Sequence, residues 1–246
     1  SNCYWTMLLT ESGIDTTFLQ CIGQIWDDRD PQGQSVFSPN SKKYARFNFF
    51  YGLNVFDFDN SRGKLSNPLN IAPDPDTFYF SGAAFSSNSR FIYTPCYNKL
   101  WQFDTQATDI SGSRILIGEL NTPSNIPEKT RFNQARLAPD GKIYIAGTVS
   151  NKHLHVINRP NCFGLECDLQ QYAIELSARN SNTMPNMPHY KQWSEQDTCE
   201  MVSTTKPNYS LQNLIKLYPN PANQYIALEG LENGDKVHWI DVSGRV

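Results

Sequence analysis

A unit of about fifty residues recurs three times, and this repeat constrains the fold more than any other feature of the chain. Its best-matching stretches are VFSPNSKKYAR at 36–46, AFSSNSRFIYT at 84–94 and RLAPDGKIYIA at 136–146. Each stretch has a tight turn built on Asn or Asp, then a basic residue and a strand containing aromatic residues. Because Asn40, Asn88 and the pair Asp140-Gly141 tolerate positive φ angles, each stretch predicts a β-hairpin.

Further strands follow each hairpin at a nearly constant distance. The segments 53–58, 100–104 and 154–158 alternate apolar and polar residues with the period of a β-strand. A closing strand is predicted at 114–118 and at 171–175. Units of several short strands at this spacing are typical of β-propeller blades. A β-sandwich, the other all-β possibility, does not explain why the same features recur three times in the same order.

The first residues fit the same unit in part. Residues 4–9 resemble its third strand and residues 18–22 its fourth, without a preceding turn. We therefore expect the chain to begin inside a blade, with an incomplete propeller over residues 1–200. Within the complete units, Phe37, Phe85 and Leu137 occupy matching places and are expected to be buried at equivalent positions.

Charge and hydropathy exclude some partners. The 21 Lys and Arg residues against 24 Asp and Glu residues leave a formal net charge of −3, without long runs of one sign. This balance argues against nucleic-acid binding. No apolar stretch approaches the roughly 20 residues that cross a bilayer, so no transmembrane segment is expected.

The composition changes near the C-terminus. Residues 201–216 are rich in Ser, Thr and Lys and contain Pro207, which is typical of a linker. Residues 217–246 then predict a separate β module, with strands at 224–228 and 236–240 around a turn at 232–235. A two-stranded hairpin is marginal alone, so the module is expected to be the start of a larger one.

This C-terminal module resembles a known family. The box Tyr218-Pro219-Asn220-Pro221 followed by Asp241-Val-Ser-Gly244-Arg is similar to the opening half of the C-terminal sorting domain of the type IX (Por) secretion system, a small Ig-like β-sandwich. The resemblance implies export through the periplasm and an outer-membrane translocon, the expected partner during export. The mature protein would then be extracellular or displayed on the outer cell surface.

The repeats are similar to secreted propeller proteins of the same bacterial lineages. Phrases that carry this likeness lie at 85–88, 139–144, 155–160 and 184–190. The overall expectation is therefore an all-β chain, a β-propeller of four-stranded blades followed by the start of an Ig-like sandwich. Propellers host many unrelated functions, so this likeness predicts a fold and no activity.

Six cysteines are scattered along the chain, and Cys162 and Cys167 form the only close pair. Without a second close pair of ligands, zinc is a weaker interpretation than a local disulfide across Gly164. Two buried thiols are the alternative. The pairing of Cys3, Cys21, Cys96 and Cys199 stays open, because four cysteines allow three connectivities.

The densest polar cluster lies between two units, at 26–33. Its candidate ligand-binding residues are Trp26, Asp27, Asp28 and Asp30. Asp28 and Asp30 match the first positions of a calcium loop, but Pro39 stands where the bidentate Glu belongs. A solvated loop between blades is the simpler interpretation, and no metal site is predicted.

No recognisable catalytic motif occurs in the sequence, and no cofactor is predicted. His153 and His155 lie two residues apart on a strand and could share a metal, but ordinary strand residues are the simpler interpretation. The aromatic residues Tyr4, Trp5, Phe56, Trp101 and Tyr144 are expected to pack within blades rather than stack on sugars.

We therefore expect a binding, adhesion or structural module, with an extracellular glycan or protein as its partner. An extracellular enzyme acting on glycans or peptides is the alternative, and a component of a larger extracellular assembly is a third class.

Overall fold

The computed structural model of the chain describes residues 2–25, 33–48, 50–73, 82–126, 130–148, 150–180, 182–185, 199, 216–218 and 227–229. The chain divides into two compact units, Ser1–Cys199 and Glu200–Val246, which are described separately. The first unit is all-β: its described residues form strands β1 to β14 and one 3₁₀ turn, Gly164–Cys167. No helix among the described residues is long and apolar enough to span a membrane.

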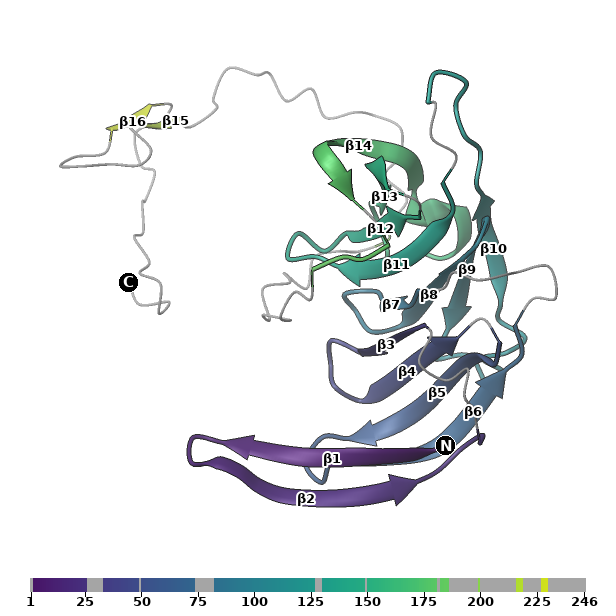
Figure 1. Ribbon diagram of the computed structural model, residues 1–246, viewed down its shortest axis with the longest axis vertical. Coiled ribbons are helices and arrows are strands. Elements are labelled where there is room, and N and C mark those ends of the chain that lie inside the picture. Colours follow the sequence, from purple (N-terminus) through teal and green to yellow (C-terminus); the bar gives the residue numbers. More distant parts are fainter. Residues whose placement is uncertain are drawn as a thin grey trace. The chain divides into compact units, whose positions relative to one another are not determined.

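The three sequence repeats form three four-stranded antiparallel sheets (Figure 1). The first sheet comprises β3 (Gln34–Phe37), β4 (Lys43–Asn48), β5 (Gly52–Asp59) and β6 (Lys64–Ile71). The second comprises β7 (Ala84–Phe85), β8 (Phe91–Cys96), β9 (Lys99–Asp104) and β10 (Ile115–Glu119). The third comprises β11 (Phe132–Leu137), β12 (Ile143–Gly147), β13 (Asn151–Ile157) and β14 (Leu169–Asn180). In each sheet the strands pair in sequence order, as predicted for consecutive hairpins.

The turn between the first two strands has the same backbone conformation at one position in all three sheets, and two of the sheets share a side-chain hydrogen bond there. In the first two sheets a serine hydroxyl donates to the side-chain Oδ1 of the asparagine two residues later, Ser38 to Asn40 at 2.8 Å and Ser86 to Asn88 at 2.7 Å. The residue after the Asn or Asp has positive φ in all three turns: 57° at Ser41, 66° at Ser89 and 80° at Gly141. The expectation of positive φ at Asn40 and Asn88 is therefore wrong, because the left-handed conformation falls on the residue that follows each of them. In the third turn it falls on Gly141, as expected.

Each sheet packs on the next through one face. One core cluster joins Ala45, Phe47, Leu53 and Val55 of the first sheet to Phe85, Ile92 and Phe103 of the second. A second cluster joins Ala84, Phe91, Tyr93 and Leu100 of the second sheet to Ala135, Leu137, Ile143 and Ile145 of the third. Burial of these two apolar layers is the main stabilising contribution to the stack of sheets.

One buried side chain ties the first strands of the three sheets together. Gln34 of β3 is 5% exposed. Its amide nitrogen donates to the Ala135 carbonyl oxygen at 2.6 Å, and its side-chain oxygen accepts from the Ala83 and Ala135 amides at 3.1 and 3.0 Å. Gln34 thus links β3 to β11 and to Ala83, the residue directly before β7.

The N-terminal strands predicted at 4–9 and 18–22 form one hairpin, β1 (Cys3–Thr10) and β2 (Gly13–Cys21), closed by a Cys3–Cys21 disulfide. One face contacts the first sheet, where the Tyr4 ring lies edge-on to Tyr44 and Phe56. On the opposite face Trp5 and Met7 are 65% and 58% exposed.

The expectation of three equivalent buried positions is wrong for one of them. Phe85 and Leu137 are 1% and 5% exposed, whereas Phe37 is 43% exposed. Phe85 and Leu137 face a preceding four-stranded sheet. Phe37 instead packs against Tyr44 and Phe58 and lines a pocket of about 210 Å³ beside β1. The two-stranded hairpin does not fill the space beside Phe37.

In the second unit the described residues form one short antiparallel ladder, β15 (Lys216–Tyr218) with β16 (Ala227–Glu229). The strand predicted at 224–228 overlaps β16, whose partner among the described residues is β15. The second predicted strand, 236–240, lies outside the described residues. β15 ends at Tyr218, directly before Pro219, which has no amide hydrogen to donate. The sorting-motif residues Pro219, Asn220, Pro221, Asp241 and Gly244 lie outside the described residues, as does most of the predicted linker.

Candidate functional site

A pocket of about 870 Å³ opens on the third sheet, on the face that points away from the second sheet. We call it the Arg136 pocket. Its apolar wall comprises Ala138, Pro139, Leu154, Leu176, Met184 and Pro185, and its polar residues are Arg136, Asp140, Tyr144, Asn180 and Thr183. The volume falls in the range of small-molecule sites, about 300–1,000 Å³, and an apolar wall with few polar groups is typical of such sites.

Strand alternation explains why this face carries the pocket. On β11 and β12, Leu137 and Ile143 point into the core against the second sheet. Their neighbours Arg136 and Tyr144 are opposed across the same two strands and point to the other face. On β13, Leu154 pairs with Ala146 and continues the pocket floor beyond Tyr144.

The pocket face differs from the corresponding faces of the other sheets. The position of the Arg136–Tyr144 pair is taken by Val36–Ala45 in the first sheet and Ala84–Tyr93 in the second. Those two pairs lie under the following sheet. The third sheet therefore places a cation at a position where the two covered sheets have small apolar residues.

Arg136 is the cationic group of the pocket. Its side chain is partly buried, and its buried Nε has no hydrogen-bond partner among the described residues. Burial lowers the pKa of the guanidinium, and none of the described carboxylates forms an ion pair with it. A charged group held among apolar residues without a counter-charge is costly, and it favours the binding of an anion.

Tyr144 and Asp140 form a linked pair at the pocket rim. The Tyr144 hydroxyl donates to Asp140 Oδ2 at 2.6 Å, and Asp140 Oδ1 accepts from the Lys142 amide at 3.1 Å. Burial, together with the hydrogen bond to Asp140, raises the pKa of Tyr144 to about 12. The phenol therefore stays protonated at neutral pH, and the Asp140 carboxylate already has two donors.

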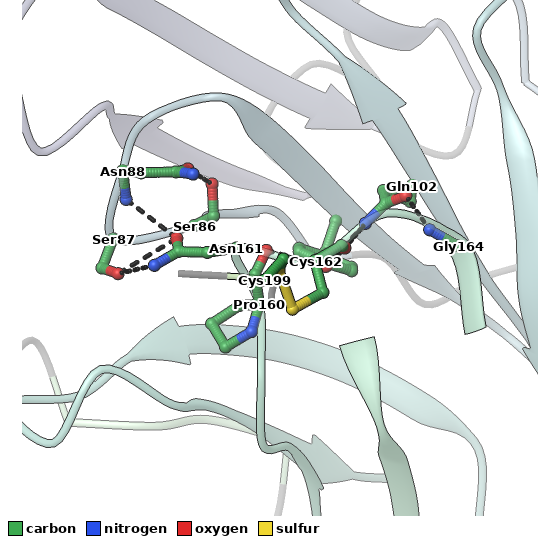
Figure 2. The surroundings of a disulfide bond; sticks show 10 residues. Ser86, Ser87, Asn88, Gln102, Pro160, Asn161, Cys162, Gly164 and Cys199 are labelled. Atoms are coloured by element: carbon green, nitrogen blue, oxygen red, sulfur yellow. Dashed lines mark hydrogen bonds between the residues drawn. A yellow bond between two sulfur atoms is a disulfide. The ribbon is translucent and has the colours of Figure 1, made fainter. Parts of the chain in front are cut away.

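The predicted Cys162–Cys167 disulfide is wrong. Cys162 is bonded to Cys199 (Figure 2). Cys167 is a buried thiol. The turn Gly164–Cys167 directs Cys167 into the core between the second and third sheets, where burial raises the pKa of its thiol to about 11. Disulfides such as Cys3–Cys21 and Cys162–Cys199 form in oxidising compartments.

The loop that carries Cys162 is fixed to the second sheet by buried hydrogen bonds. Gln102 donates to the Cys162 carbonyl oxygen at 2.8 Å and accepts from the Gly164 amide at 2.8 Å (Figure 2). On the other side of the loop, Asn161 donates to the Ser87 hydroxyl at 2.8 Å. Cys162 is therefore held in place independently of its disulfide.

The two histidines of β13 have a packing role. His155 is fully buried, with its ring edge-on to Phe132 and Tyr172 at 4.8 Å between centroids in each case. Its Nδ1 accepts from the Tyr172 amide at 3.2 Å, and burial lowers its pKa to about 3. Within the described ranges no group of three His, Cys, Asp or Glu side chains could hold a metal ion.

The other candidate residues from the sequence differ in their surroundings, and four of them lie outside the part of the chain that the structure describes. Trp26, Asp27, Asp28 and Asp30 lie outside the described residues. Phe56 is buried as expected, Trp101 is half-buried with Arg114 over its ring at 4.8 Å, and Trp5 is largely exposed. Sequence reasoning missed Arg136, although the motif held one signal for it: Arg136 stands where the other repeats have Val36 and Ala84.

No protein-family model matches the sequence, and no curated protein matches it. Among solved structures, a Lactobacillus plantarum protein is 14% identical, with 73% of this chain and 51% of that chain covered and a TM-score of 0.47. A Bacteroides uniformis protein assigned provisionally as a 6-phosphogluconolactonase is 18% identical, with 73% and 54% covered and a TM-score of 0.45. Dihydro-heme d1 dehydrogenase NirN is 15% identical, with 59% and 28% covered and a TM-score of 0.37.

This chain thus spans about half, or less, of the length of these proteins. Their described activities apply to those proteins alone.

Proposed function

We propose that this protein is a β-propeller-type binding module that holds its ligand in the Arg136 pocket. The pocket itself carries the proposal, because it combines ligand-sized volume, an apolar wall and a cation that no described carboxylate pairs. A propeller arrangement is supported by the packing of each sheet on the next and by Gln34, which joins the first strands.

A binding role fits the polar groups of the pocket better than catalysis. Asp140 is the single carboxylate among the described lining residues, and it is occupied by the Tyr144 hydroxyl. Glycoside hydrolysis needs two carboxyl groups that flank the scissile bond. An extracellular enzyme is therefore the less favoured alternative.

We further propose that the module is exported and acts outside the cell or on its outer surface. The resemblance of residues 217–246 to a type IX sorting domain supports this route, with the outer-membrane translocon as the partner during export. The two disulfides are consistent with the oxidising periplasm that such cargo crosses.

Binding is tested with a neutral apolar fluorophore, N-phenyl-1-naphthylamine. We expect saturable fluorescence enhancement with the intact chain and its loss in Ala138→Trp, whose indole would fill the pocket. Ala173→Trp is the matched control, because Ala173 is exposed on β14 and does not line the pocket. Equal fluorophore binding by both variants would place the bound dye elsewhere and overturn the proposal.

Export is tested by deleting residues 217–246 in a bacterium that has a type IX system. The truncated protein should fold and accumulate in the periplasm, whereas the full chain reaches the medium or the cell surface. Arrival of the truncated protein at the surface would show that this segment is not the sorting signal.

A further inference from the structure

The geometry points to an amphipathic organic anion as the ligand class of the Arg136 pocket: an apolar body that ends in a carboxylate. This inference rests on the proposed binding function and adds the chemistry of the ligand. It is carried by the position of Arg136 on β11, at one side of a pocket in which Leu154 of β13 and Leu176 of β14 form an apolar surface.

The charge of the pocket selects the head group. In the described part of the chain, Arg136 Nε is buried and has no hydrogen-bond partner, although a guanidinium offers five donors in a planar fork. A carboxylate can accept two parallel hydrogen bonds from that fork, and such charge-assisted pairs are stronger than neutral ones. Among the described lining residues the one carboxylate, on Asp140, accepts from the Tyr144 hydroxyl and the Lys142 amide instead.

The order of the strands sets the direction of the ligand. Arg136 lies on β11, Leu154 on β13 and Leu176 on β14. Three interstrand spacings separate β11 from β14, about 14 Å across the sheet. A carboxylate at Arg136 would therefore leave an extended apolar body lying over Leu154 and Leu176, next to Met184.

The repeat supports a ligand rather than another sheet as the occupant. Where a following sheet covers the equivalent face, the position of Arg136 is taken by Val36 or Ala84. A sheet of the same kind packed on the third sheet would bury the Arg136 guanidinium against apolar side chains, which is unfavourable without a counter-charge.

The test compares two ligands that differ in their head group. Decanoate and 1-decanol are each used to displace N-phenyl-1-naphthylamine from the intact chain. Because a hydrogen bond to a charged group contributes about 1.5–3 kcal/mol, decanoate should bind about tenfold more tightly than decanol, or better. In Arg136→Gln the two ligands should differ by less than about twofold, whereas Arg136→Lys should keep part of the preference.

Lys142→Gln is the matched control, since it removes one positive charge from the same turn without touching the pocket lining. It should leave the preference for decanoate unchanged. Equal affinity for both ligands, in a pocket that still binds the neutral dye, would overturn the anion inference and leave the binding function intact.

Dye binding that Ala138→Trp does not reduce would contradict both the binding function of the Arg136 pocket and the anion inference. Both would also be contradicted if sedimentation showed that the chain self-associates and if the pocket took up dye only after dissociation. A second copy of the chain would then be the occupant of the pocket.

Discussion

Arg136 on β11 lies directly opposite Tyr144 on β12, and both side chains line the same pocket. The corresponding pairs in the other two sheets are apolar or buried under the next sheet. The repeat that forms the fold is thus altered at one cross-strand pair, and this alteration produces the cationic floor of the candidate site.

Gln34 is expected to be a major stabilising residue. In Gln34→Leu, one carbonyl oxygen and two amides of the second and third sheets lose their buried partner. Since each unsatisfied buried group costs about 1–3 kcal/mol, the free energy of unfolding should fall by about 3 kcal/mol or more. Urea denaturation measures this free energy of unfolding. Gln134→Leu, at a half-buried position on β11, is the control and should change stability by less than about 0.5 kcal/mol.

The turns offer a paired test of backbone strain. Ser41 and Ser89 both have positive φ, where glycine is free of the Cβ penalty. Ser41→Gly should raise the free energy of unfolding by about 0.5–1 kcal/mol. Ser89→Gly should give no such gain, because the Ser89 hydroxyl accepts from the Asn40 amide at 3.0 Å. A matching gain in both variants would show that this bond between turns is unimportant.

The Arg90–Asp104 pair should make the stability of the fold depend on pH in the acidic range. Arg90 donates two hydrogen bonds from Nε and one from Nη2, and these bonds hold the pKa of Asp104 below its ordinary value. Because the pKa of Asp104 is lower in the folded than in the unfolded chain, the pair stabilises the fold above the ordinary carboxyl pKa. This stabilisation is lost as the pH falls through the pKa of Asp104 in the folded protein.

Asp104→Asn should therefore flatten the decline of thermal stability between neutral pH and about pH 3. Asp57→Asn is the comparison. Its carboxylate pairs with Lys43 at 2.7 Å but is more exposed, so a smaller change is expected. A larger effect at Asp57 would contradict the structure.

The cysteine pairing predicts a pattern of thiol reactivity. Cys96 and Cys167 are buried, and burial raises the pKa of Cys167. The native protein should therefore react slowly with a thiol reagent at pH 8, and the denatured, unreduced protein should show two thiols. Peptide mapping should recover Cys3–Cys21 and Cys162–Cys199. Recovery of a disulfide-linked Cys162–Cys167 peptide would contradict the Cys162–Cys199 bond and support the pairing expected from the sequence.

The strands of the repeats were predictable because their signals are local. Segments 53–58, 100–104 and 154–158 fall on β5, β9 and β13, where alternation and turn residues suffice. The fourth strand of the first sheet, β6, had no such signal. It contains Pro68 and a positive φ at Asn67, and its register with β5 shifts between Val55 and Asp57.

The disulfide and the pocket depend on contacts between distant segments. Cys199 is 37 residues from Cys162, so sequence spacing favoured the nearer Cys167. Arg136 becomes notable only once strand pairing places it opposite Tyr144, on a face that the second sheet does not cover. Periodicity predicts which residues share a face, but it does not show which face is left open.

The most direct test of ligand binding in the Arg136 pocket is methyl NMR of the intact, ¹³C-methyl-labelled chain during titration with decanoate. We predict saturable shifts confined to Leu154, Leu176 and Met184, and their loss in Arg136→Gln at the same ligand concentration. Shifts confined instead to Met7, Leu9 and Leu19 of the exposed N-terminal hairpin would contradict the assignment of the site.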